Sequence, residues 1–451
     1  MTSGAPARDG EALDLDTLSI TDTQRYVERG YPWAEWDLLR REAPVYWYDR
    51  PDVDPFWALT RYEDALTVSK RSDIFISSDR LRIFPRTQEE FSKRRKQELI
   101  ARYGPEKARR FYTLSFIDMD DPDHAAYRNL TNRSFTPRAM RMIEDHIAEL
   151  AEAYASGFAK QLINTVAEQG ECDFVHDLSV KLPMAAIFEM VGFPRDDWDE
   201  LFGIKEIEYG SDRELALAGL TPEERDVERR KANRFSTQYL FDFVEARKKA
   251  GARSDCLADV LLRAELDGRK LEDDEIFSYI NLLIAGGLET TRNATTGGVL
   301  ALLEHPEERD KLVANPELLR PAVEEILRWT SPVIQFARVA REDFELRGHT
   351  IRAGETVAMW YPSTNRDEEA WDDPYRFDIT RDPNDHLAFG GFGAHFCLGA
   401  NLARWELRGI FKELLPLLPE MELDGPPFRQ DSLHVGGIVK MPVRYRPVPA
   451  A

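Results

Sequence analysis

Cysteine is scarce in this sequence, and the three cysteines form no pattern. Among 451 residues, Cys172, Cys256 and Cys397 stand far apart without a CxxC pair, and their number is odd. Such a set builds neither a disulfide framework nor a zinc knuckle. We therefore expect the protein to work in a reducing compartment, the cytoplasm.

Long hydrophobic runs are absent as well, and basic residues are in the minority. Residues 1–9 lack the apolar core of a signal peptide, and the apolar run at 280–285 is too short to span a membrane. Lys and Arg number 60 against 81 Asp and Glu, which gives a formal net charge of −21. This balance argues against a nucleic-acid partner, so the sequence predicts a soluble protein that binds other ligands.

Apolar residues make up 43% of the chain, enough for a large core that encloses a ligand cavity. Their spacing predicts a mostly helical chain from 138 to 300, broken at Pro194 and at 210–222. Individual helices are expected over 33–41, 63–69, 275–304, 323–329 and 401–407. Strands are expected over 45–48, 56–60 and within 333–359.

A glycine-rich, apolar loop at 388–400 carries Cys397. Glycines on both sides of a thiol let backbone N–H groups approach the sulfur, and the helix expected after the loop adds the positive end of its dipole. These surroundings favour a thiolate, which suits a soft metal or a haem iron. The alternative is an ordinary buried cysteine beside a glycine turn.

The longest expected helix contains the adjacent glycines Gly286 and Gly287, followed by Glu289 and Thr290. Glycine inside a helix costs about 1 kcal/mol against alanine, so we expect something to approach the backbone there or the helix to open locally. Thr290 would then donate to a ligand while Glu289 connects to a proton route. The alternative is a helix kink in which the threonine hydroxyl bonds back to the helix.

Other polar residues also have helical spacing. His124 and Arg128 stand at i and i+4, where they would suit an anionic group such as a propionate or form an exposed pair. Glu325 and Arg328 stand at i and i+3, and the rigid segment that follows is expected to present Arg376 to Glu325. As isolated surface pairs, such contacts would contribute little to stability.

The segment from 93 to 110 is the most basic stretch of this acidic chain. A solvated helix face is the simpler interpretation, because charge runs are usually solvated. The alternative is a lid over 81–117 that meets an acidic substrate or an acidic partner protein.

Together these elements resemble the cytochrome P450 family of haem-thiolate monooxygenases over about residues 21–448. The matching motifs, in the family's order, are His-x-x-x-Arg at 124–128, Gly-Gly-Leu-Glu-Thr-Thr at 286–291, Glu-Ile-Leu-Arg at 325–328, Pro-Tyr-Arg-Phe at 374–377 and the cysteine loop at 389–399. The resemblance implies a mainly α fold with a small β region, with haem between the long central helix and the cysteine loop. It also implies one domain over 21–451, after a polar tail at 1–20.

The resemblance implies a role for each matched residue. Cys397 would be the proximal thiolate ligand of haem b. Glu289 and Thr290 would be the acid and the alcohol that deliver protons to dioxygen. Gly286 and Gly287 would make room for oxygen, although Gly286 stands where the family commonly has alanine. The other residues implied to bind haem are His124, Arg128, Arg338, Phe389, His395 and Gly399.

A structural triad and a subgroup are implied as well. Glu325, Arg328 and Arg376 match the triad that fixes the fold around the haem. The loop departs from the usual pattern because Phe389 lies eight residues before the cysteine, and Gly390 takes the usual aromatic position. This longer loop, like Phe-Thr-Pro-Arg at 135–138, is similar to actinobacterial enzymes that hydroxylate sterol side chains and methyl-branched lipids.

The activity implied is insertion of one oxygen atom of O2 into a hydrophobic small molecule of terpenoid, steroid, lipid or polyketide type. Because no flavin or ferredoxin-like segment is recognised in the chain, electrons would come from a separate ferredoxin and ferredoxin reductase. The arginines proposed to dock them are Arg133, Arg138, Arg141, Arg404 and Arg408. The alternatives are a peroxide-driven enzyme, an isomerase or dehydratase of the same fold, tailoring of a carrier-bound substrate, and a haem carrier or sensor without turnover.

Overall fold

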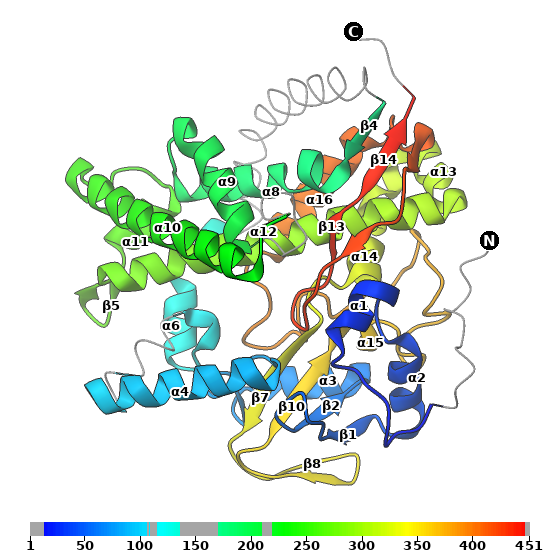
Figure 1. The fold of residues 1–451 in the computed structure, drawn as a ribbon, viewed down its shortest axis with the longest axis horizontal. Coiled ribbons are helices and arrows are strands. Elements are labelled where there is room, and N and C mark those ends of the chain that lie inside the picture. Colours follow the sequence, from blue (N-terminus) through cyan, green and yellow to red (C-terminus); the bar gives the residue numbers. More distant parts are fainter. Residues whose placement is uncertain (1–12, 106–107, 109–114, 136–169, 210–218, 447–451) are drawn as a thin grey trace. The chain divides into compact units, whose positions relative to one another are not determined.

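The computed structural model describes residues 13–105, 108, 115–135, 170–209 and 219–446, and the chain forms two compact units. Unit 1 comprises residues 1–125, 300–398 and 429–437, and unit 2 comprises 126–299, 399–428 and 438–451. Each unit has its own sheet and its own helices (Figure 1). Within the described ranges, no helix is long and apolar enough to cross a membrane.

Unit 1 is organised by a five-stranded sheet, in the order β1 (Val45–Tyr48), β2 (Phe56–Leu59), β10 (Thr356–Trp360), β7 (Gln335–Ala340) and β3 (Phe75–Ile76). β1 and β2 form an antiparallel pair, as expected for two aromatic-rich strands joined by a Pro/Asp turn. β10 pairs with β2 in parallel and with β7 antiparallel. Since successive side chains of a strand point to opposite faces, Phe336 and Arg338 on β7 share one face.

Two hydrophobic clusters pack against this sheet. The core around β1 and β2 contains Trp36, Phe56 and Trp360, and it also takes in Leu18 and Ile20 from the end of the segment predicted as a tail. The remaining elements of unit 1 are α1 (Thr23–Arg29), α2 (Trp33–Glu42), α3 (Tyr62–Lys70), α4 (Arg86–Tyr103), α13 (Pro306–Ala314), α14 (Leu319–Thr330), α15 (Tyr361–Thr364), β8 (Phe344–Leu346) and β9 (His349–Ile351).

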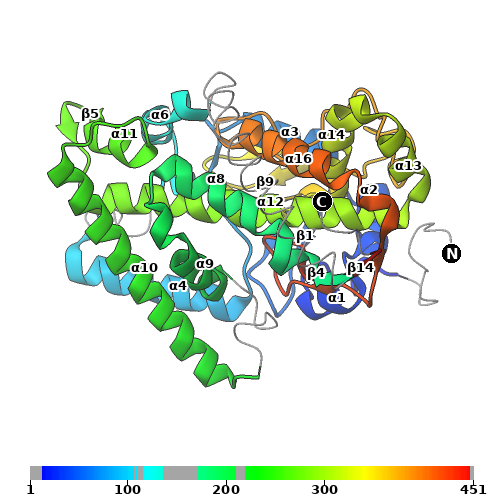
Figure 2. The same ribbon diagram turned by 90° about the horizontal axis from the view of Figure 1, so that it is seen from above.

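Unit 2 contains most of the longest helix, α12 (Asp273–Glu304), which begins two residues before its predicted start. Figure 2 shows α12 as one unbroken helix. α8 (Lys181–Val191) packs with α11 (Leu257–Arg263) and α16 (Ala400–Leu414), and α9 (Trp198–Tyr209) packs with α10 (Pro222–Ala250). A small sheet has the order β11 (Met421–Leu423), β14 (Pro442–Tyr445) and β4 (Glu171–Asp173).

The start of α10 follows the break predicted near 222. Thr221 and Glu224 form a reciprocal capping box, and Pro222 occupies the first turn. The helix α6 (Asp123–Asn129) begins in unit 1 and ends in unit 2. The remaining strands are β5 (Glu265–Leu266), β6 (Arg269–Lys270), β12 (Phe428–Arg429) and β13 (Ile438–Lys440). Short helical turns cover Phe116–Asp118, Asn132–Phe135, Val175–Ser179, Arg195–Asp197, Pro316–Leu318 and Leu418–Glu420.

The predicted fold class, mainly α with a small β region, is confirmed. Residues 93–103 of the basic stretch lie in α4, an 18-residue helix in which only Glu89 is buried. The mostly helical region predicted over 138–300 is helical in most of its described part, while residues 138–169 and 210–218 lie outside the described residues.

Candidate functional site

The cysteine loop is closed by backbone hydrogen bonds. The Cys397 N–H donates to the Phe389 carbonyl oxygen at 3.0 Å, and the Phe396 N–H donates to the Gly393 oxygen at 3.0 Å. Gly390 has a φ of +90°, a conformation that favours glycine. The extra residue before the cysteine is therefore accommodated inside a closed loop whose first turn needs a glycine.

Two further glycines allow this loop to pack directly against α3. A Cβ at Gly391 would lie 2.4 Å from Ser69 Oγ, and one at Gly393 would lie 1.7 Å from the Ser69 carbonyl oxygen. Both distances are shorter than any van der Waals contact, so alanine at either position would push the loop off α3. The glycines that the sequence associates with the thiol are thus required by packing within unit 1.

Two of the predicted haem-binding histidines come together in unit 1. The ring centroids of His124 and His395 lie 3.9 Å apart, with the planes inclined by 30°. His124 is buried on α6, and His395 Nε2 lies 3.1 Å from Ser77 Oγ. The Asp120 carboxylate accepts a hydrogen bond from the Ser77 N–H at 2.6 Å. Arg128 follows His124 by one turn of α6 and belongs to unit 2.

Arg338, which the resemblance assigns to a haem propionate, is a buried guanidinium on β7. It is 6% exposed, and its Nη1 donates to the Ala337 carbonyl oxygen at 2.6 Å. Burial lowers the pKa of Arg338, although the charge of Asp120 opposes the shift. Among the residues that the structure describes, no carboxylate lies within 4.0 Å of it. A buried cation of this kind fits an anionic group that the polypeptide does not supply.

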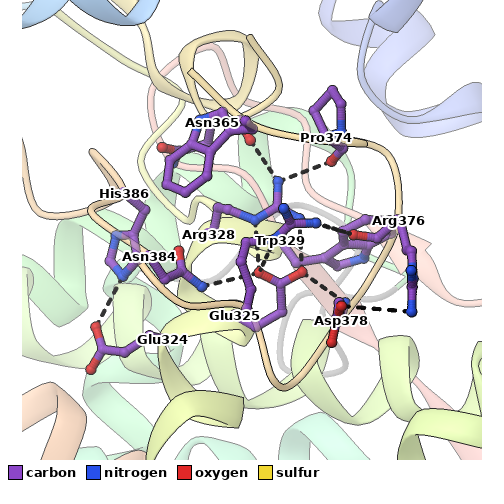
Figure 3. A network of polar contacts seen from close by, with 12 residues as sticks. Glu324, Glu325, Arg328, Trp329, Asn365, Pro374, Arg376, Asp378, Asn384 and His386 are labelled. Atoms are coloured by element: carbon purple, nitrogen blue, oxygen red, sulfur yellow. Dashed lines mark hydrogen bonds and ion pairs between the residues drawn. The ribbon is translucent and has the colours of Figure 1, made fainter. Parts of the chain in front are cut away.

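Glu325 and Arg328 form a fully buried ion pair on α14 (Figure 3). Arg328 Nε and Nη2 donate to the two Glu325 oxygens at 2.7 and 2.8 Å, and both side chains are 0% exposed. Arg328 also donates to the carbonyl oxygens of Asn365, Pro374 and Arg376. One guanidinium therefore joins α14 to the segment that follows α15.

The predicted contact between the Arg376 side chain and Glu325 is wrong. The Arg376 guanidinium is 59% exposed and lies 3.6 Å from Asp378, while its carbonyl oxygen accepts from Arg328 at 3.2 Å. Arg381 takes the predicted place, with its Nε 3.3 Å from Glu325 Oε2. The path of the main chain explains the difference, because it turns the Arg376 carbonyl inward and its side chain outward.

The acid and the alcohol predicted on α12 lie in a continuous helix. The Thr290 hydroxyl donates to the Gly286 carbonyl oxygen at 2.7 Å, the back-bonding that was the alternative to a ligand contact. A Cβ at Gly287 would lie 2.8 Å from Ile187 on α8, whereas one at Gly286 would meet nothing within 4 Å. Packing therefore requires Gly287, and Gly286 faces open space. Glu289 is half-buried.

A buried carboxyl group that the sequence interpretation missed lies on α16. Glu406 is 1% exposed and is hydrogen-bonded to Thr291, the neighbour of Thr290 on α12. Burial raises the pKa of Glu406 to about 8. Leu402, one turn earlier, is also buried, so the apolar period of α16 places position 406 on the inward face. The signal in the sequence that could have indicated this buried carboxyl group is an acidic residue at an inward position of the helix.

Replacing Glu406 with glutamine should make stability less dependent on pH. The folded protein keeps the Glu406 proton up to about pH 8, whereas the unfolded chain loses it near the ordinary value of 4.5. The stability contributed by this proton is complete below pH 4.5 and is lost as the pH rises to about 8, by at most about 1.4 kcal/mol per pH unit.

Urea unfolding of the holoenzyme between pH 5 and 9 measures this effect. The free energy of unfolding of Glu406→Gln minus that of the unchanged protein should grow up to about pH 8 and then stay constant. Glu413→Gln, at an exposed position of the same helix, is the matched control. A constant difference from pH 5 to 8 would show that Glu406 is ionised in the folded protein.

The basic stretch on α4 points into solvent. Phe91 is 56% exposed, with the guanidinium of Arg94 5.7 Å from its ring centroid, and Lys93 pairs with Asp54. The described part of this stretch therefore matches the solvated-face interpretation. Of the arginines predicted to dock redox proteins, Arg133 is exposed, and Arg404 and Arg408 are half-buried. Residues 106–107 and 109–110, Arg138 and Arg141 lie outside the described residues.

Three comparisons relate the chain to known proteins. A family model described as Cytochrome P450 matches residues 220–418. The chain is 35% identical over 435 residues to Steroid C26-monooxygenase from Rhodococcus jostii (strain RHA1), covering 95% of this chain and 85% of that protein. It is 38% identical over 460 residues to Methyl-branched lipid omega-hydroxylase from Mycobacterium tuberculosis (strain ATCC 25618 / H37Rv), covering 98% and 95%. The crystal structure of CYP108D1 from Novosphingobium aromaticivorans DSM12444 has a TM-score of 0.78 at 28% identity, covering 94% of this chain and 97% of that one.

The fold and these relatives define the class of protein, a haem-thiolate enzyme. The chain belongs to the cytochrome P450 family and is a monooxygenase. Its cofactor is haem b with an axial cysteine. The residues present fit this group: a closed loop presents a cysteine, and unit 1 contains a buried guanidinium without a close carboxylate among its described residues.

Proposed function

We propose that Cys397 is the axial ligand and that the enzyme hydroxylates a hydrophobic small molecule, most closely a steroid or a methyl-branched lipid. The observation that carries the ligand assignment is the closed glycine loop, in which the Cys397 N–H bonds to Phe389 and two glycines pack against α3. The substrate class is supported by the names of two relatives, one acting on steroids and one on methyl-branched lipids. Terpenoid and polyketide-like substrates share the required apolar character.

When bound, the haem supplies the activation of dioxygen and the transfer of oxygen to a carbon–hydrogen bond. The residues of the chain bind and orient it. His124, His395 and Arg338 would donate hydrogen bonds to its carboxylates, because the two histidine rings lie together and the guanidinium is buried. Arg128, Phe389 and Gly399 remain predicted haem-binding residues.

Glu289 and Thr290 would hold and move protons. The Thr290 hydroxyl directs its proton to the Gly286 carbonyl oxygen, so the lone pairs of its oxygen are free to accept a hydrogen bond from water. Rotation of the hydroxyl would then pass a proton onward, while the half-buried Glu289 exchanges protons with solvent. Gly286 leaves open space beside this hydroxyl for oxygen.

Thr290→Ala should uncouple electron consumption from hydroxylation. Without the hydroxyl, protons are no longer directed to dioxygen. A larger share of the reducing equivalents is therefore released as hydrogen peroxide. Product formed per reducing equivalent should fall by about tenfold or more. Thr295→Ala is the matched control, because Thr295 makes the same bond back to the helix, at 2.9 Å to the Thr291 oxygen. Equal coupling in both variants, measured as product against peroxide, would refute the proton role.

Electrons would come from a ferredoxin and a ferredoxin reductase. Support comes from arginines at exposed or half-buried positions, of which Arg133, Arg404 and Arg408 are described. An acidic redox protein would bind them with an affinity that falls as salt is added.

The experiment that tests the function is a panel of spin-state titrations followed by product analysis. Steroids, methyl-branched fatty acids, terpenes and macrolides are added to the oxidised holoenzyme, and compounds that shift the spin state are incubated with reductant, redox proteins and dioxygen. Incorporation of one labelled oxygen atom from dioxygen supports the proposal. Product formed with hydrogen peroxide alone, and none with dioxygen, would instead indicate a peroxygenase.

A carrier-bound substrate is a second candidate, favoured by one feature. α4 presents Lys93, Arg94 and Arg95 at exposed positions of an otherwise acidic protein. An acyl chain offered both free and attached to an acidic carrier protein separates the two candidates, because only the second predicts a preference for the carrier.

A further inference from the structure

A second polar cluster of unit 1 lies beside Arg338 and takes part in none of the roles above. Arg82, which precedes α4, donates from Nε to His434 Nε2 at 2.9 Å. His434 must therefore carry its proton on Nδ1, which lies 3.0 Å from the Gln335 carbonyl oxygen. Burial and the charge of Arg82 lower the pKa of His434 to about 3, so the ring stays neutral at physiological pH.

The Arg82 and Arg338 guanidiniums approach one aromatic ring. Their Cζ atoms lie 5.8 and 5.9 Å from the ring centroid of Phe336. Burial lowers the pKa of both arginines, and the charge of Arg82 adds to the shift of Arg338. A buried cation, Arg338, and a partly buried one, Arg82, thus lie close together in surroundings that disfavour the charge of each.

The carboxylates near these cations are poorly placed to neutralise them. In the described part of the chain, the one carboxylate within 4.0 Å of Arg82 is Asp118, 3.9 Å from Nη1. That distance is too long for a hydrogen bond. Asp120, the other acidic group facing Arg338, accepts hydrogen bonds from the Ser77 and Ser78 N–H groups.

The hydrogen bond to His434 uses Nε of Arg82 and leaves the edge formed by its two terminal amino groups available to a ligand. Because Nε is bonded to His434, the two terminal amino groups are left, and the side chain is 25% exposed. Two parallel N–H groups at the edge of a guanidinium match the two oxygens of a carboxylate. The orientation of Arg82 is therefore set by a neutral histidine that adds no charge of its own.

We propose that Arg82 and Arg338, which both contact Phe336, form a carboxylate-binding site in which His434 is the residue that positions Arg82. The ligand is either a carboxylate of the haem or the carboxylate of an acidic lipid substrate. The first source rests on the haem contact proposed above for Arg338, and the second rests on the substrate class proposed above.

The haem arm of the test measures the rate at which the holoenzyme transfers haem to an excess of a haem-scavenging apoprotein. Arg82→Gln should speed transfer by about tenfold or more if Arg82 binds a haem carboxylate, because a hydrogen bond to a charged group is lost. Arg71→Gln is the matched control: Arg71 also contacts an aromatic ring, that of Phe344, but it is bonded to Asp73.

The substrate arm compares hexadecanoic acid with hexadecanol in spin-state titrations of the same holoenzymes. If Arg82 binds a substrate carboxylate, Arg82→Gln should lose about tenfold or more of the affinity for the acid and leave that for the alcohol unchanged. If neither compound shifts the spin state, the haem arm decides alone. Failure of the proposed function would appear separately, as no hydroxylation of any hydrophobic compound.

The outcomes are distinct. Faster haem transfer assigns the site to the cofactor, a lost preference for the acid assigns it to the substrate, and Arg82→Gln matching Arg71→Gln in both arms overturns the proposal. Arg82→Lys keeps the charge without the paired donors, so its haem transfer rate or acid affinity should lie between those of the unchanged protein and Arg82→Gln. This variant replaces Arg82→Gln in the test if the glutamine variant does not fold. His434→Phe should change the same readout as Arg82→Gln by a smaller factor, and wild-type values would overturn its positioning role.

Discussion

Replacing Cys397 with serine is expected to abolish hydroxylation and to remove the absorption band that a thiolate-bound haem gives when it is reduced under carbon monoxide. A serine oxygen is a harder donor than sulfur and stays protonated at neutral pH, so it releases far less electron density to iron. The loop itself should persist, because its closing bonds join backbone atoms and glycines. The measurements are the reduced carbon monoxide spectrum and turnover, with haem content recorded beside them.

The other two cysteines supply the controls for this result. Burial raises the pKa of Cys172 to about 12, which keeps it a thiol at neutral pH, and Cys256 lies before α11 in unit 2. Serine at either position should leave the spectrum and turnover unchanged. If Cys397→Ser kept the thiolate band, the ligand would have to be sought at Cys172 or Cys256.

Arg328→Met is expected to cost about 3–5 kcal/mol of the free energy of unfolding, the usual effect of removing one partner of a buried ion pair. Glu325 would keep its burial and lose both hydrogen bonds from the guanidinium, and three carbonyl oxygens would lose their donor. Haem content should fall with stability, because the segment tied to α14 leads into the cysteine loop. Urea unfolding of the holoenzyme measures the loss.

A second replacement sharpens this prediction. Changing Arg328 to methionine and Glu325 to leucine together should recover part of the loss, since the Glu325 carboxylate is then no longer buried without its partner. The recovery should be incomplete, because Arg381 loses its contact with Glu325. Arg376→Ala is the control, because only the backbone carbonyl of that residue contacts Arg328 and its side chain is exposed. It should change stability by no more than about 0.5 kcal/mol. A loss from Arg376→Ala as large as that from Arg328→Met would restore the predicted triad.

The elements of the fold could be predicted from the sequence where the spacing of apolar residues gave a clear local pattern. α12 follows from thirty residues of helical spacing, and β1 and β2 follow from short runs rich in aromatic residues on either side of a turn. The cysteine loop and the ion pair of α14 follow from local spacing, since i and i+3 fix two side chains on one helix face. Local spacing says nothing about burial, however, and the sequence alone gave no reason to expect a pair with 0% exposure.

What the sequence did not reveal depends on contacts between distant segments. Arg381 replaces Arg376 because an irregular segment has no period from which the direction of a side chain follows. Arg82 meets His434 across 352 positions of sequence, a pairing that no motif announces. The burial of Glu406 could have been predicted from the sequence. An acidic residue at an inward position of a strongly amphipathic helix is a recognisable conflict between charge and burial.

The fit of Gly391 and Gly393 against Ser69 limits how the thiolate can be tuned by engineering. A library that varies these two positions would mostly return displaced loops, because even one methyl group overlaps α3. Phe392, between them, is 49% exposed and has a φ of +55°, so substitution there alters the outer surface of the loop without entering that contact. Variation of this loop should therefore begin at Phe392, while the two glycines are kept.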